Sequence, residues 1–155
     1  MDCMNRDSLY AVFGQVIRYH HHRTQKMLDK VGVYPGQPPM LFALYHKDGQ
    51  NQKELAERLG IKPATATVML GRIEKSGLVE RKQDLNDQRV SRVYITDKGK
   101  EVCKECADIM KQINEKMFSN FTEEEKIIMR RLLMQMRDNL VNSDEENINF
   151  RYSDD

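Results

Sequence analysis

Cysteine and histidine are the residue types in this chain whose spacing could support redox or metal chemistry. Cys103 and Cys106 form a C-x-x-C pair, a spacing that elsewhere binds zinc or forms a catalytic dithiol. Here the pair lies inside a predicted helix, on or beside its apolar side. Zinc would need further ligands, and a reactive dithiol is favoured at a helix N-terminus. We therefore predict that both cysteines pack in the core.

The remaining cysteine and the histidines are weaker candidates. Nothing around Cys3 indicates a lowered pKa, so an inert thiol is favoured over an oxidant sensor. His20, His21 and His22 are consecutive, and consecutive helical residues point about 100° apart, so they cannot chelate one ion together. One or two of them, or His46, could contribute to a site built across a dimer. We predict no bound metal and no cofactor.

Enzymatic activity has no recognisable motif in this sequence. There is no glycine-rich phosphate loop, no nucleophile elbow and no pair of carboxylates in a catalytic setting. The many Asp and Glu residues fall in the first turns of predicted helices and on their solvent faces, where the helix dipole and solubility account for them. We predict that the protein is not an enzyme.

Charge is distributed unevenly along the chain, although the formal net charge is only +1. Residues 51–99 contain ten Lys and Arg against seven Asp and Glu, a net +3, whereas residues 138–155 contain six acids and one base, a net −5. The acidic end therefore masks a mildly basic centre, and the local field governs contact with nucleic acid. On charge alone, an ordinary solvated surface remains an equally good explanation.

The basic centre begins with two short predicted helices. Asn51 has the side chain of a helix N-cap, with Glu54 three residues later to complete a capping box. Gly60 is a typical C-cap, and Pro63 suits the first position of the second helix, which should end before Gly77. Helices joined by so short a turn cross steeply, which predicts a helix-turn-helix.

The second of these helices separates into two faces. The inward face comprises Ala66, Met69, Leu70 and Ile73. The outward face comprises Ala64, Thr65, Thr67, Val68, Gly71, Arg72 and Lys75. Small side chains let a helix approach base edges closely, and an Arg can reach a guanine edge or a phosphate.

Alternating patterns after Gly77 predict a β-hairpin. Its strands are residues 78–83 and 90–95, and its polar tip is residues 84–89. A hairpin directly after a recognition helix is a wing. Arg89 is placed to enter a minor groove, and Asp87 could hold its guanidinium in a fixed fork.

Long helices flank this centre and complete the predicted fold. We predict a helix over residues 5–31, a loop containing Pro38 and Pro39, a short helix around residues 40–45, and two helices within residues 97–141. The fold class is mostly α with a small β-hairpin wing (α+β). Residues 1–142 form one domain, in which 37–96 is the winged helix-turn-helix unit. Residues 143–155 are an acidic tail that we predict to be disordered.

Residues 52–99 resemble the winged helix-turn-helix of the MarR family of bacterial transcriptional regulators. The matching motifs are QKELAERLGI, the Pro-Ala-Thr-Ala-Thr opening of the second helix, RIEKSGLVER, the Asp87-x-Arg89 of the wing and VYITDKG. The family's flanking helices extend the resemblance in outline to the whole chain. The chain departs from the family at Lys62, where Ser is commoner, and at Val68 and Gly71, where polar residues are commoner.

The first and last helices are longer than a winged unit needs, and their apolar faces predict a two-fold homodimer. The resemblance implies the same arrangement, with helices 5–31 and 97–141 forming the dimer. It also implies a small aromatic or amphipathic effector between these helices and the winged unit. The residues assigned to that pocket are Phe13, Ile17, His20 and Tyr45. The competing explanation is a monomer whose long helices fold back onto its own core.

The sequence therefore predicts a cytoplasmic, homodimeric repressor that binds a pseudo-palindromic operator and is released by an effector. The predicted DNA-binding residues are Lys62, Ala64, Thr65, Thr67, Val68, Arg72, Lys75, Arg81, Asp87, Arg89 and Arg92. Of these, Lys62, Lys75, Arg81 and Arg92 are assigned to phosphates.

The absence of a signal-peptide pattern and of an apolar run of about 20 residues argues against export and membrane insertion. Cysteines without framework spacing suit a reducing compartment. Two alternatives remain open: a winged-helix protein–protein adaptor, and a redox- or metal-sensing regulator.

Overall fold

The structure, a computed structural model, describes residues 5–85 and 87–141. Within them the chain forms six α-helices and a three-stranded antiparallel sheet, so the predicted α+β class is confirmed. The elements are α1 (Leu9–Leu28), the 3-10 turn η2 (Asp29–Val31), α2 (Gln37–His46), β1 (Gln50–Asn51), α3 (Gln52–Leu59), α4 (Pro63–Lys75), β2 (Val79–Gln83), β3 (Ser91–Ile95), α5 (Asp97–Met117) and α6 (Glu123–Val141). Cys3 and the predicted tail, residues 143–155, lie outside the described residues.

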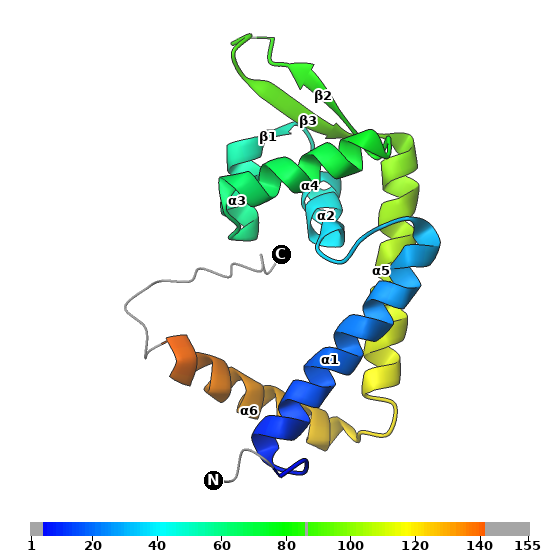
Figure 1. Ribbon diagram of the computed structural model, residues 1–155, viewed down its shortest axis with the longest axis vertical. Helices are drawn as coiled ribbons and strands as arrows, with labels where there is room; N and C mark the ends of the chain where they lie inside the picture. Colours follow the sequence, from blue (N-terminus) through cyan, green and yellow to red (C-terminus); the bar gives the residue numbers. More distant parts are fainter. Residues whose placement is uncertain (1–4, 86, 142–155) are drawn as a thin grey trace.

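The winged unit and the long helices occupy different ends of the molecule (Figure 1). Helices α2, α3 and α4 gather at one end with the sheet, whose β2–β3 hairpin projects beyond them. Helix α5 leaves this unit and packs beside α1, and α6 turns away from the far end of α5. Helix α4 and the hairpin thus lie at the opposite end of α5 from α6.

Helix boundaries follow local capping chemistry more closely than hydrophobic periodicity. The Ser8 side chain accepts a hydrogen bond from the Ala11 N–H (3.3 Å), so α1 begins at Leu9 and not near residue 5 as predicted. The predicted loop at Pro38 and Pro39 is also wrong, because both lie in the first turn of α2. Proline is tolerated there, since first-turn N–H groups have no partner within the helix.

The sheet has one strand more than the predicted hairpin. Its order is β1-β3-β2, and Val79 pairs with Ile95 at one end of the hairpin and Gln83 with Ser91 at the other. The additional strand, β1, pairs Gln50 with Val93. A strand of two residues is too short to show alternation in the sequence, so no pattern predicts it.

The core lies in the winged unit, at the C-terminal end of α1 and along α5 as far as Ile113. Helix α4 contributes Ala66, Leu70 and Ile73, and α5 contributes Cys103, Cys106, Ile109 and Ile113. In contrast, no residue of α6 is buried, although its sequence is rich in Ile, Leu and Met. Within the described ranges, no helix is long and apolar enough to cross a bilayer.

The turn after α4 is bonded to the start of α5. Thr96 caps α5 by accepting from the Gly99 N–H (3.0 Å), and its hydroxyl donates to the Gly77 carbonyl (2.8 Å). The Thr96 N–H donates to the Leu78 carbonyl (3.1 Å), and the Lys98 ammonium donates to the Ser76 carbonyl (2.9 Å). A Cβ on Gly99 would lie 2.0 Å from the Leu78 carbonyl oxygen, so only glycine permits this approach.

We expect Gly99→Ala to lower the free energy of unfolding by about 1–3 kcal/mol, because the added methyl group forces α5 away from the turn after α4. Urea denaturation followed by circular dichroism would measure the change. Gly71→Ala is the matched control. Gly71 lies in the exposed interior of α4, where an added Cβ would have nothing within 4 Å, so the same substitution should raise stability by up to about 1 kcal/mol. Equal effects of the two substitutions would contradict the proposed role of the close contact.

Candidate nucleic-acid interface

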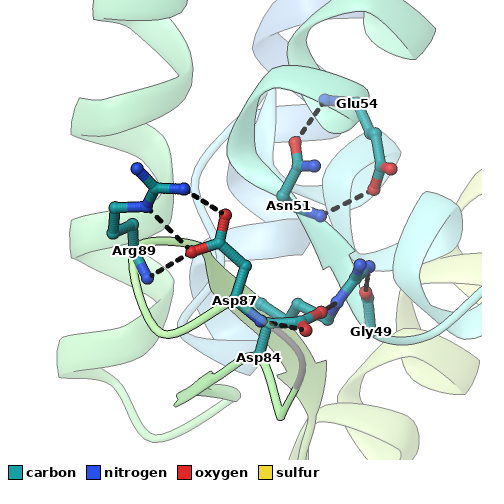
Figure 2. Close-up of polar contacts among 7 residues, drawn as sticks. Gly49, Asn51, Glu54, Asp84, Asp87 and Arg89 are labelled. Atoms are coloured by element: carbon teal, nitrogen blue, oxygen red, sulfur yellow. Dashed lines mark hydrogen bonds and ion pairs between the residues drawn. The ribbon is translucent and has the colours of Figure 1, made fainter.

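The capping residues predicted from the sequence set the two ends of α3 and the start of α4. The Asn51 side chain accepts from the Glu54 N–H (2.9 Å), and the Glu54 carboxylate accepts from the Asn51 N–H (2.8 Å), as Figure 2 shows. Gly60 ends α3 in the left-handed conformation (φ 61°), and Pro63 opens α4. The capping box thus fixes where α3 begins, and Gly60 and Pro63 fix the short turn from α3 into α4.

Helix α4 presents the predicted outward face to solvent. Ala66, Leu70 and Ile73 are buried and Met69 packs partly against the core. The outward residues are all exposed: Ala64, Thr65, Thr67, Val68, Gly71, Arg72 and Lys75. Lys62, at the N-cap of α4, is exposed as well and makes no side-chain capping bond.

The Thr67 hydroxyl, although exposed, is hydrogen-bonded within the protein, and no pattern in the sequence predicts this. Its Oγ1 donates to the Pro63 carbonyl (2.9 Å) and accepts from the amide Nε2 of Gln52 (2.7 Å). Gln52 is the first residue of α3, so this bond links the two helices of the helix-turn-helix. The two partners are 15 residues apart in the sequence, so no local sequence pattern indicates the bond between them.

The cations of α4 and those of the hairpin differ in their partners. Lys62, Arg72 and Lys75 form no ion pair with any residue that the structure describes. Arg81 of β2 instead donates from Nε to the Glu74 carboxylate of α4 (3.0 Å). Helix α4 therefore carries the positive charges that an external anion can approach without breaking an internal pair.

Arg89 and Asp87 form the predicted fork at the wing tip (Figure 2). The Arg89 N–H and Nε both donate to Asp87 Oδ1 (3.0 and 3.1 Å), and Nη2 donates to Oδ2 (3.4 Å). The hydrogen bonds from the Arg89 side chain and backbone hold the pKa of Asp87 below its usual value. The Arg89 side chain is nevertheless 91% exposed, so its orientation is set while its outer surface stays accessible.

Arg92 lies in β3, one residue from the tip end of the paired hairpin, and contacts the protein itself. It forms an ion pair with Asp84, whose side chain is 10% exposed, and its Nη1 donates to the Gly49 carbonyl (2.9 Å). The neighbouring Asp48 carboxylate accepts from the Ile95 N–H (2.9 Å). The hydrogen bonds from Arg92 to Gly49 and from Ile95 to Asp48 tie β3 to the segment that precedes α3. The geometry of Arg92 thus differs from that of an outward-facing phosphate ligand.

Both cysteines of the C-x-x-C pair are buried, as predicted: Cys103 is 4% and Cys106 0% exposed. Burial raises the pKa of both thiols, that of Cys106 to about 11. His20, His21, His22 and His46 are exposed. Within the part of the chain that the structure describes, no three His, Cys, Asp or Glu side chains are grouped so as to hold a metal ion.

The residues predicted for an effector pocket are all exposed to solvent: Phe13, Ile17 and His20 on α1, and Tyr45 on α2. The exposed fraction is 39% for Phe13, 52% for Ile17 and 51% for Tyr45. An open groove of about 520 Å³ lies elsewhere, between the end of α5 and α6. Its lining residues are Asn114, Phe118, Lys126, Met129, Arg130, Leu133, Met134 and Arg137. The effector site stays a prediction.

We expect the two core thiols to resist alkylation in the native protein. At pH 8 a thiol of pKa about 11 is ionised in about one molecule in a thousand, against about one in ten at the ordinary value of 9.0. In a Cys3→Ser background, iodoacetamide should label neither Cys103 nor Cys106 of the folded protein within minutes and both in urea, as read by mass spectrometry. Rapid native labelling of either cysteine would contradict the core placement.

Comparison with known proteins identifies the fold family. A sequence model of the MarR family matches residues 34–91. The HTH-type transcriptional repressor MdtR of Bacillus subtilis (strain 168) is 31% identical over 120 residues, which are 77% of this chain and 75% of that protein. The crystal structure of MarR matches with a TM-score of 0.69 at 25% identity, covering 90% of this chain and 96% of that one.

The S. aureus MepR–DNA complex shows the same fold, with a TM-score of 0.73 at 22% identity over 88% of this chain and 99% of that one. The family model covers the helix-turn-helix and most of the wing described above, and the identity with MdtR extends over most of both chains. On these grounds the chain belongs to the MarR family of winged helix-turn-helix, DNA-binding transcriptional regulators.

Proposed function

We propose that the protein is a homodimeric repressor that binds a pseudo-palindromic operator and releases it when a small molecule binds. The observation that carries DNA binding is the exposed face of α4, which bears Arg72 and Lys75 without internal ion pairs among the described residues. The similarity to a relative named as a repressor supports the direction of regulation.

Two elements would contact DNA in this proposal. Helix α4 enters the major groove with its outward face, where Thr65 and Arg72 bear on base edges and Lys62 and Lys75 on phosphates. Arg89, held by Asp87, enters the flanking minor groove.

Two arginines of the hairpin are bonded within the protein. Arg81 contacts a phosphate only if it leaves Glu74, since its Nε is bonded there. Arg92 acts as a positioning residue that fixes the hairpin against the segment before α3 through Asp84 and Gly49.

The exposed apolar residues of α1 and α6 support the dimer. Helix α1 buries only Thr24 and Leu28, and α6 buries none of its residues. Their exposed apolar side chains are Leu9, Tyr10, Val12, Phe13, Val16, Ile17 and Tyr19 on α1, and Ile127, Ile128, Leu132, Leu133, Met134, Leu140 and Val141 on α6. A second copy would cover these surfaces, and the groove between α5 and α6 would receive its apolar side chains. Two-fold symmetry then presents two α4 helices to successive turns of the major groove.

The effector would act by changing the separation of the two α4 helices. We propose that a small aromatic or amphipathic molecule binds between the dimer helices and the winged unit, near Phe13, Ile17, His20 and Tyr45. It would favour a dimer whose half-site spacing does not match the operator, and so lower DNA affinity. The described cysteines do not favour an oxidant as the input, because both are buried and their thiol forms are stabilised.

We expect Arg89→Ala to weaken binding to the operator at least tenfold, or about 1.4 kcal/mol, because it removes the minor-groove contact of the wing. Fluorescence anisotropy with a labelled duplex taken from upstream of the gene, or selected from genomic fragments, would measure it at two salt concentrations. Lys111→Ala is the control: it removes a positive charge from α5 about 20 Å along the helix from its start. It should leave the affinity within twofold.

Salt dependence distinguishes DNA binding from the adaptor alternative. Each phosphate contact makes log K fall with log salt by about 0.9, so wild-type binding should weaken steeply as salt rises. A genomic-fragment selection that enriches no sequence would contradict the repressor proposal and favour a winged-helix adaptor that binds another protein.

We expect Leu132→Glu to convert the dimer into a monomer, because it introduces a charge into the apolar surface of α6. Sedimentation equilibrium and light scattering would read the mass, and operator affinity should fall at least a hundredfold since one half-site is lost. Arg131→Glu adds the same charged side chain one position away, on a residue that is already charged, and should leave the protein dimeric. A Leu132→Glu variant that remains a dimer would contradict the assigned interface.

A further inference from the structure

Ahead of Arg72, the exposed face of α4 offers few hydrogen-bond donors to a ligand. Ala64 and Val68 have none, and the Val68 side chain is 54% exposed. Thr67 has a hydroxyl, but its single hydrogen is donated to the Pro63 carbonyl at 2.9 Å. A base acceptor facing this residue would have to break that bond to receive a hydrogen bond. Apart from the Thr65 hydroxyl, the side-chain groups that this part of the α4 face offers to a ligand are therefore apolar.

Gln52 fixes the Thr67 side chain in this state. Its amide donates to Thr67 Oγ1 at 2.7 Å, so the hydroxyl both donates and accepts within the protein. Two bonds to different partners hold χ1 in one rotamer, and the group that remains for an external contact is the Thr67 methyl. Gln52 belongs to α3, so the link also keeps α3 and α4 in register at this point.

Gly71 lies on the same surface of α4, and the fold does not require a glycine at this position. Its φ is not positive, and a Cβ built on it would have nothing within 4 Å. Glycine inside a helix lowers stability by about 1 kcal/mol relative to alanine, and no packing constraint of the described structure explains its presence. Residues 64, 67, 68 and 71 are spaced by three or four, so they lie along one stripe of α4. We call these four residues the apolar stripe.

We propose that the apolar stripe reads thymine 5-methyl groups in the major groove of each operator half-site, with Val68 as the principal contact. This inference rests on the proposed function and specifies which bases the recognition helix selects. The thymine methyl is the apolar group that the major groove displays, and cytosine lacks it. The missing side chain of Gly71 lets the base edges come close to Val68, and Arg72 lies at the end of the stripe, where a guanine edge or a phosphate follows.

Replacing thymine by deoxyuridine tests this directly, because it removes the methyl and keeps base pairing. A duplex selected by the wild-type protein from random sequences would be rebuilt with one thymine at a time changed to uracil. We expect one or more positions per half-site at which the change weakens wild-type binding about fourfold, the factor that corresponds to about 0.8 kcal/mol for one buried methyl. At those positions the Val68→Ala protein should lose less than twofold.

Arg89→Ala is the matched control, since it weakens binding through the wing and leaves α4 unchanged. It should keep the fourfold uracil penalty at the same positions. A uracil penalty that persists in Val68→Ala would come from another residue of α4 or from DNA shape, and it would overturn the assignment to Val68. Tight binding with no penalty at any thymine would overturn methyl reading while leaving the proposed function intact. Failure to select any duplex would overturn both.

Discussion

The N-terminus of α5 rests directly on the backbone of the turn that follows α4, and Gly99 is the residue that allows it. With a Cβ at that position only 2.0 Å from the Leu78 carbonyl oxygen, α5 could not lie where it does. Because Thr96 and Lys98 also bond to this turn, a tilt of α5 must carry the C-terminal end of α4 with it. The proposed control of operator binding depends on this stiffness, since a flexible junction would absorb a change in the dimer helices before it reached α4.

The parts of the structure that could be predicted from the sequence are those determined by neighbouring residues. The capping box of Asn51 and Glu54, the C-cap at Gly60 and the fork between Asp87 and Arg89 each join residues two to five positions apart along one element or turn. Their chemistry is therefore visible in the sequence as spacing. The outward face of α4 could also be predicted from the sequence, because helical periodicity separates Leu70 and Ile73 from the exposed positions.

What the sequence could not provide are contacts between distant residues. Arg92 bonds to Gly49 across 43 residues, and Gln52 to Thr67 across 15. Nothing in the neighbourhood of Arg92 distinguishes it from an arginine that faces DNA, and the sequence therefore suggested a phosphate contact. The strand β1 escaped notice for a related reason, because two residues acquire their strand geometry only from pairing with β3. Tertiary partners decide the role of such residues.

The pairing of Arg89 with Asp87 bears on the kinetics of an encounter with DNA. The two charges nearly cancel at a distance, so the wing tip exerts little long-range attraction, whereas Lys62, Arg72 and Lys75 keep their full field. Electrostatic steering would then come from α4, and the wing would engage only after the helix has docked. On this view the α4 cations govern the association rate and its ionic-strength dependence, and Arg89 governs the lifetime of the complex.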